Sequence, residues 1–355
     1  MKAQRLLILT IVLVLGIVLP LSSLRAQDAA QPDLDAIKDY LLEKATALAD
    51  GAAELAATSD AYYQLTQAAN FDYTALWDAN QSELAELLAQ AKTQWITISP
   101  LYEQMEGIVA GVPSLAEYDV IIDAGASAEE DAENAADFNI TLPDGTVMEK
   151  PGNLFGLLES ALWGTRAEFV ALADVDLDGN STVDFGEVLP DANILKGTAD
   201  SMVSYTSDLL MSAIDWQPNE TDAFTALVVM VPTMSEYFGS WKESRFVAGD
   251  KAISTTFAVI SRLSDIQDIL ASLQVIYDGV GPLVESTNPE QHEQINQGLT
   301  DLKDYVGKIF KEEQDGHQFT PEEADFFGTE AQNRAMTITG QITQAASLLD
   351  ITLPE

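Results

Sequence analysis

The sequence predicts an all-α protein that consists of two antiparallel helix bundles. Three observations lead to this prediction. Apolar residues recur every three or four positions over most of the 355 residues, alternating strand patterns are nearly absent, and two proline-containing helical segments resemble each other 182 positions apart. Hydrophobic residues make up 47% of the chain, which is enough for a large core and excludes wholesale disorder.

The charge balance is strongly acidic, with 57 Asp and Glu residues against 17 Lys and Arg residues and a formal net charge of -40. Such a chain repels nucleic-acid phosphates and anionic lipids, and it favours cationic partners, metal ions included. Adaptation to salt is an alternative explanation of the acidity. Because the chain has no cysteine, disulfides, thiolate zinc sites, cysteine nucleophiles and iron-sulfur clusters are excluded.

The N-terminus has the pattern of a secretory signal peptide, residues 1–26. Lys2 and Arg5 precede an apolar run from Leu6 to Leu19, and a short c-region follows from Pro20 to Ala26, after which we expect cleavage. The run is shorter than the roughly 20 residues that a membrane span needs, and no later stretch is apolar enough to span. The sequence therefore predicts an extracytoplasmic protein, periplasmic or secreted.

The helices follow from apolar stripes in each predicted bundle, the first within residues 27–173 and the second within residues 198–355. A threonine cap, a proline and two acidic residues at 320–323 mark the start of the last helix. The stripes are Leu84, Leu88, Ala91, Trp95 and Ile98; Val259, Leu263, Ile266, Leu270, Leu273 and Tyr277; Ile295, Leu299, Leu302, Val306 and Ile309; and Ile338, Ile342, Ala345 and Leu349.

The two similar segments each contain a proline, Pro100 and Pro282, at which we expect the helix to kink or end. Internal duplication and chance similarity between bundle helices both explain the likeness. Between the first helices and about Leu154, residues 124–153 are acidic and turn-rich, which predicts a long surface loop.

Residues 174–197 form an acidic linker that contains a calcium-loop pattern. Counted from Asp176, oxygen-bearing residues fall at the ligand positions of an EF-hand loop, with Ser181 in place of the turn glycine. Counting from Asp174 restores the glycine but loses the final glutamate, and an ordinary acidic linker is the alternative. A helix that runs to Leu172 is expected to enter the loop, and Pro190 to shorten the exit. The predicted calcium ligands are Asp176, Asp178, Asn180, the backbone carbonyl of Thr182, Asp184 and Glu187.

At residues 155–164, Phe-Gly-Leu-Leu-Glu-Ser-Ala-Leu-Trp-Gly, the chain resembles the imelysin family, whose helix motif reads Gly-Phe-His-x-Ile-Glu-x-x-Leu-Trp-Gly. The stretches 95–103, 122–124, 243–246 and 265–267 are similar to further family segments in the same order. The resemblance implies an all-helical extracytoplasmic protein with a metal-associated site. The first activity described in the family was proteolysis, and its relatives include a periplasmic iron-uptake component.

The chain departs from the family pattern at two expected ligands, because Gly156 stands in place of the histidine and Ser99 in place of a glutamate. The remaining candidates for this degenerate inherited site are Glu103, Asp123 and Glu159. Three carboxylates suit a hard, oxygen-preferring cation. The alternative is that Glu159 and its neighbours only hydrogen-bond to helix ends.

No histidine-based zinc motif, serine-nucleophile elbow or phosphate loop occurs, and the chain has two histidines, His292 and His317. The sequence therefore favours a metal- or iron-associated binding or uptake accessory protein without catalysis, with iron or another divalent metal and calcium as cofactors and an envelope iron-uptake protein as a partner. One alternative is a zinc-type metallopeptidase of the imelysin family. Another is a calcium-stabilised scaffold or interaction protein.

Overall fold

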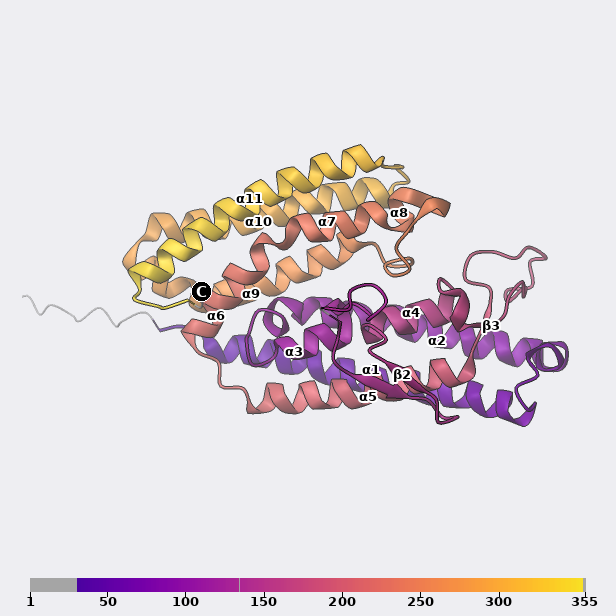
Figure 1. The fold of residues 1–355 in the computed structure, drawn as a ribbon. Helices are drawn as coiled ribbons and strands as arrows, with labels where there is room; N and C mark the ends of the chain where they lie inside the picture. The colour runs from indigo at the N-terminus through magenta and orange to yellow at the C-terminus, as the bar shows by residue number, and fades with distance from the viewer. Residues whose placement is uncertain (1–30, 134, 354–355) are drawn as a thin grey trace, which may run out of the picture. The chain divides into compact units, whose positions relative to one another are not determined.

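Long helices make up most of the described residues, which are residues 31–133 and 135–353. The predicted signal peptide lies outside them. The computed structural model contains α1 (Leu34–Ala68), α2 (Tyr73–Val109), α3 (Ala116–Asp119), α4 (Leu154–Trp163), α5 (Ala192–Asp215), α6 (Glu220–Met230), α7 (Met234–Glu243), α8 (Arg245–Ala248), α9 (Arg262–Thr287), α10 (Pro289–Gln314) and α11 (Pro321–Leu348) (Figure 1). The all-α prediction is confirmed.

The predicted apolar stripes form the core. Every stripe residue is buried except Val259, which precedes α9, and Leu349, which follows α11; both are partly buried. The start of α11 is a capping box, in which the Thr320 hydroxyl accepts from the Glu323 backbone N–H and the Glu323 carboxylate accepts from the Thr320 N–H. Helix position and facing therefore follow from periodicity and capping, as expected.

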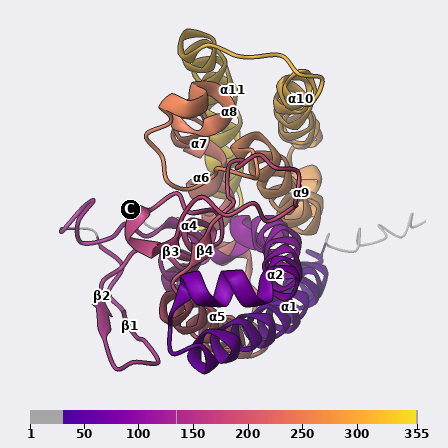
Figure 2. The ribbon, with the colours of Figure 1, turned by 90° about the vertical axis from the view of Figure 1, so that its right-hand side faces the viewer.

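The helices pack in two groups. In one group α1 contacts α2 and α5, and α4 contacts α5; in the other α9 contacts α10 and α7, and α11 contacts α10 and α7. Figure 2 shows α1, α2 and α5 side by side, with α10 and α11 on the far side of α9. Contacts of α1 and α2 with α9, and of α2 with α6, join the groups.

Helix α5 spans the predicted boundary at residue 198. It begins at Ala192, where the Asp191 side chain accepts from the backbone N–H groups of Asn193 and Ile194. Its main contacts are with α1 of the N-terminal group. The packing therefore changes groups after α5, near Asp215, rather than within the linker.

Neither proline ends its helix, so the part of the expectation that the helices end at Pro100 or Pro282 is wrong. Both lie inside continuous helices, α2 and α9, and the non-helical residue within α2 is Asn80. An interior proline costs a helix about 3 kcal/mol. Burial of Ile98 and Tyr102 on either side of Pro100 offsets that cost, because α2 packs against α1 and α9 along this stretch.

The excursion at residues 124–153 is more ordered than a surface loop. It contains the antiparallel pair β1 (Asn139–Thr141) and β2 (Val147–Glu149). Ile140 is buried, and a Cβ on Gly197 of α5 would lie 2.6 Å from Leu142 Cδ2, so Gly197 permits the close approach of this hairpin. A second pair, β3 (Val170–Leu172) and β4 (Leu189–Pro190), closes the ends of the predicted calcium loop.

None of the described helices combines the length and apolar character needed to cross a membrane.

Candidate functional site

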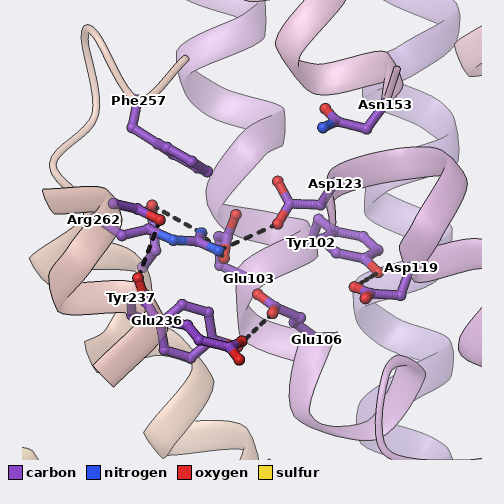
Figure 3. A network of polar contacts seen from close by, with 12 residues as sticks. Tyr102, Glu103, Glu106, Asp119, Asp123, Asn153, Glu236, Tyr237, Phe257 and Arg262 are labelled. Carbon is purple, nitrogen blue, oxygen red and sulfur yellow. Dashed lines mark hydrogen bonds and ion pairs between the residues drawn. The ribbon is translucent and has the colours of Figure 1, made fainter. Parts of the chain in front are cut away.

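Five carboxylates from four segments of the chain lie close together between the two helix groups, and Figure 3 shows Glu103, Glu106, Asp119 and Asp123 among them. We call them the acidic cluster. Four are buried, and Asp119 is half-buried. Their placement follows from helix geometry, since residues three apart on a helix share one face. The members are Glu103 and Glu106 on α2, Asp119 at the end of α3, Asp123 in a π-helical turn at Val120–Ala124, and Asp265 in the first turn of α9.

Arg262, the first residue of α9, supplies a positive charge to the cluster. Its guanidinium lies 3.3 Å from Glu103 Oε2, 3.5 Å from Asp123 Oδ2 and 3.2 Å from Asp265 Oδ2. The rings of Tyr237 and Phe257 lie 4.6 Å and 4.3 Å from it and add cation–π contacts. One guanidinium therefore serves three carboxylates.

Two tyrosines donate to the remaining members. The Tyr237 hydroxyl donates to Glu106 Oε1 at 2.7 Å, and the Tyr102 hydroxyl donates to Asp119 Oδ1 at 2.8 Å (Figure 3). The second oxygen of Glu106, Oε2, is buried and has no hydrogen-bond partner within the described part of the chain. Buried carboxylate oxygens are rarely left unpaired, so Glu106 has capacity for another partner.

Burial is the largest cause of the raised pKa values of Asp265, Asp123 and Glu103. It raises the pKa of Asp265 to about 7 and that of Asp123 to about 6, in each case against the opposing effect of Arg262. Burial, together with the neighbouring carboxylates, raises the pKa of Glu103 well above its usual range. The cluster therefore holds more negative charge than Arg262 balances, unless protons or a cation are bound.

Glu159, the third predicted ligand, binds backbone instead. Its Oε1 accepts from the N–H groups of Ala258 and Val259, and its Oε2 accepts from that of Phe257. Burial raises the pKa of Glu159 to about 7 in spite of these bonds, which favour the charged form. By holding this segment, in which Phe257 has a left-handed φ of 53°, Glu159 fixes the Phe257 ring against Arg262.

The predicted residues Glu103, Asp123 and Glu159 nevertheless line one small cavity of about 20 Å³, which also includes both departures from the family pattern, Ser99 and Gly156. That space suits one water-sized occupant. A Cβ on Gly156 would lie 2.8 Å from Thr256 Cγ2, so the 254–258 segment occupies the space beside α4 that a larger residue would need.

Three of the acids fit a metal ion. Glu103, Glu106 and Asp123 each offer a carboxylate oxygen within 4.8 Å of the other two, and all three are buried. Sequence reasoning identified Glu103 and Asp123 but missed Glu106, Asp265 and Arg262. The spacing of Glu103 and Glu106, three apart on a helix stripe, was the available signal.

A second, larger cavity of about 490 Å³ borders the cluster. Glu106, Asp119, Asp123 and Arg262 line it, together with Tyr237 and the exposed Glu236 of α7. Figure 3 shows Glu106 on α2 and Glu236 and Tyr237 on α7. The cluster is therefore reachable from a space that is large enough for a small molecule.

The predicted calcium loop forms a closed turn in the register that starts at Asp176. Ser181, at the turn-glycine position, has a left-handed φ of 69°, and its N–H donates to Asp176 Oδ2 at 2.8 Å. Asp176, Asp178 and Glu187 each offer an oxygen within 4.8 Å of the others. Helix α4 ends at Trp163, before Gly164 with its left-handed φ, so β3 rather than the expected helix enters the loop.

The other predicted calcium ligands lie in the same turn. Asn180 donates to Asp178 Oδ2 and Asp184 Oδ2, and the Thr182 N–H donates to Asn180 Oδ1. Glu187 is buried, and its carboxylate accepts from the N–H groups of Leu177, Asp178 and Asp184. The turn therefore directs its acidic side chains inward through its own backbone donors.

The loop also contacts both helix groups. Lys92 Nζ of α2 donates to the Gly186 carbonyl oxygen at 2.6 Å, and burial lowers the pKa of Lys92 to about 8, against the effect of nearby Glu187. On the other side, the Arg245 guanidinium of α8 lies 3.8 Å from the Phe185 ring. The loop is therefore in direct contact with α2 of one helix group and α8 of the other.

The fold and the cluster define an all-helical protein with a buried carboxylate site suited to a cation. The family model for imelysin matches residues 36–348, and the chain belongs to the imelysin family. The resemblance found in the motifs is thereby confirmed. No curated protein matches the chain.

Proposed function

We propose that this protein is an extracytoplasmic, non-catalytic binding protein for a divalent metal ion, iron being the leading candidate, and that it serves metal uptake at the cell envelope. The observation that carries the proposal is the group Glu103, Glu106 and Asp123, whose buried oxygens lie within 4.8 Å of one another. Membership in the imelysin family supports a metal-related role. The signal-peptide pattern of residues 1–26 supports export.

The proposed ligand set differs from the one expected from sequence. Glu103 and Asp123 stay as ligands, Glu106 joins them, and Glu159 becomes the residue that holds the segment bearing Phe257. An all-carboxylate set favours hard, oxygen-preferring cations over soft ones. A bound cation would add positive charge where Arg262 alone faces five carboxylates.

Equilibrium dialysis of the chain without residues 1–26, against Fe²⁺ under anaerobic conditions and against Zn²⁺, tests the proposal. We expect Glu103→Gln and Glu106→Gln each to weaken binding at least about tenfold, as loss of a charged ligand requires. Glu86→Gln, an exposed change on the same helix, is the matched control. Unchanged binding in both cluster variants would contradict the ligand set, and chelator-sensitive cleavage of an unfolded protein would contradict the non-catalytic role.

Calcium binding by the 176–187 loop is a second candidate function, and the left-handed backbone at Ser181 favours it. That angle is the one that the EF-hand turn requires at its sixth position. The contacts of Gly186 with Lys92 and of Phe185 with Arg245 support a role in stabilising the joint between the helix groups. Calcium-dependent unfolding tests this function, as set out in the Discussion.

A further inference from the structure

The larger cavity has an unused hydrogen-bond acceptor in its wall. Glu106 is only 3% exposed, its Oε1 accepts from Tyr237, and its Oε2 has no partner among the described residues. Leaving such an oxygen unpaired in the interior is unfavourable, and more so when the group is charged. A donor that enters the cavity would remove this cost.

The charge of the lining points to a cation. Three members of the acidic cluster, Glu106, Asp119 and Asp123, line the cavity. The exposed Glu130 and Glu236 line it as well. Arg262 is the basic residue in this lining, and its guanidinium is already shared with Glu103, Asp123 and Asp265. Negative walls of this kind attract and concentrate cations.

The size and the remaining walls point to an organic cation. The cavity measures about 490 Å³, far more than one metal ion occupies, and falls in the range of small-molecule sites. Ala110, Val229 and Met230 supply aliphatic surface, and the Tyr237 and Phe257 rings supply aromatic surface. Methylene groups pack on such walls, whereas a hydrated metal ion gains nothing from them.

We propose that this cavity binds a small aliphatic diamine or polyamine, with one ammonium group on Glu106 and a second toward Glu236. An ammonium group has three N–H donors, which suit the free Glu106 oxygen and neighbouring carboxylates. The inference goes beyond the proposed metal function, although both use Glu106 and Asp123.

The surroundings of the Arg262 guanidinium are a model for how the cavity would bind an organic cation. Its charge lies among carboxylates while its flat faces contact Tyr237 and Phe257. The proposed ligand repeats the same combination at the free oxygen of Glu106, with an aliphatic chain in place of the arginine stem. Two cations can lie this close because five carboxylates surround them.

Isothermal titration calorimetry in metal-free buffer tests the proposal with 1,4-diaminobutane, spermidine and n-butylamine as probes. We expect the two polyamines to bind, and n-butylamine to bind more weakly because it lacks the second ammonium group. Glu106→Gln is expected to weaken diamine binding at least about tenfold. Glu236→Gln is expected to reduce diamine affinity to the level of n-butylamine and to leave n-butylamine unchanged, whereas Glu86→Gln changes neither.

Absence of heat with all three amines, or equal diamine affinity in wild type, Glu106→Gln and Glu236→Gln, would overturn the proposal. Should Glu106→Gln fail to fold by circular dichroism, the exposed Glu236→Gln decides alone. Diamine binding without Fe²⁺ or Zn²⁺ binding supports this inference and contradicts the metal function. Metal binding without amine binding does the reverse.

Discussion

The acidic cluster and the 176–187 loop are both rich in carboxylates, but they are built in opposite ways. The cluster gathers Glu103, Glu106, Asp119, Asp123 and Asp265 from four separate segments and faces them with one guanidinium. The loop takes its acids from a single run of 12 residues and satisfies them with its own backbone N–H groups. One site depends on tertiary packing, and the other depends on local turn geometry.

The difference predicts how each site responds to disturbance. The cluster acids are mostly buried. Loss of the Arg262 guanidinium would therefore leave unpaired charges in a low-dielectric interior and affect the whole fold. The loop acids other than Glu187 are exposed or half-buried, and water screens their repulsion. Stability should therefore respond strongly to changes in the cluster and moderately to calcium in the loop.

The largest effect is expected from loss of the internal cation. Arg262→Met keeps an unbranched apolar stem but removes the guanidinium, so Glu103, Asp123 and Asp265 lose their shared partner. Breaking a buried ion pair in this way typically costs about 3–5 kcal/mol. Urea unfolding at pH 8 should show a loss of that size. Arg334→Met, which removes an exposed pair with Glu330, is the control and should cost at most about 1 kcal/mol; equal losses would contradict the contrast.

A pH dependence of similar origin should follow. In the folded protein the pKa of Asp265 is about 7 and that of Asp123 is about 6, whereas an Asp in the unfolded chain has a pKa of about 4. Between pH 4 and these higher values, the folded state therefore binds more protons than the unfolded state. The folding free energy contributed by these groups is therefore present at low pH and lost as the pH rises toward 7. We expect unfolding free energy to fall by a few kcal/mol from pH 5 to pH 8, since one pKa unit equals about 1.4 kcal/mol.

Asp265→Asn tests whether the cluster causes this trend, because the substitution removes one of the titrating groups. The slope of stability against pH should become smaller in this variant. Asp325→Asn, at an exposed acid paired with Lys242, should leave the slope as in wild type. If both variants keep the wild-type slope, the general repulsion of a chain with charge -40 explains the trend instead.

The sequence could predict what is encoded locally. Helical stripes such as Leu263 to Tyr277 reached the core because periodicity decides which face is buried, and the 176–187 register was readable because its oxygens recur at fixed spacing. The effect of Pro100 was not readable, since packing against two other helices overrode the local penalty. Local rules fail where tertiary contacts dominate.

The cluster could be predicted only in part. Family motifs pointed to Glu103, Asp123 and Glu159, but no local pattern shows that Arg262, more than 150 positions from Glu103, would insert its charge between them. Nor does the sequence show that Glu159 binds three backbone N–H groups. Which carboxylates are free to bind a ligand depends on neighbours that only the fold brings together.

The next largest effect is expected at the 176–187 loop, where calcium should raise the free energy of unfolding. For a dissociation constant of about 10⁻⁴ to 10⁻³ M, 10 mM calcium should raise the unfolding free energy by about 1.4–2.7 kcal/mol. Thermal unfolding with 10 mM magnesium separates binding from charge screening. Asp176→Asn with Asp178→Asn should remove the calcium shift. Asp174→Asn, just outside the preferred register, should leave it intact; loss of the shift in this variant would instead favour the register that starts at Asp174.

The smallest expected effect comes from Ser181, the residue that stands in the turn-glycine position of the loop. Its φ of 69° lies in the left-handed region, which costs an L-residue about 1–2 kcal/mol and costs glycine almost nothing. Glycine is also freer in the unfolded chain, so part of the gain is lost. Ser181→Gly should therefore raise the unfolding free energy by up to about 1 kcal/mol and strengthen calcium binding by a few-fold.

Ser181→Ala is the matched comparison, because alanine also lacks the hydroxyl but keeps the left-handed penalty. If backbone conformation controls this turn, the glycine variant gains stability and the alanine variant does not. If the serine hydroxyl matters more, both variants lose stability together. Urea unfolding of the two variants, with and without calcium, distinguishes these results. Because Ser181 is exposed and its N–H bonds to Asp176 within the loop, neither variant should change the pH slope that Asp265→Asn reduces, which keeps the tests of the two sites independent.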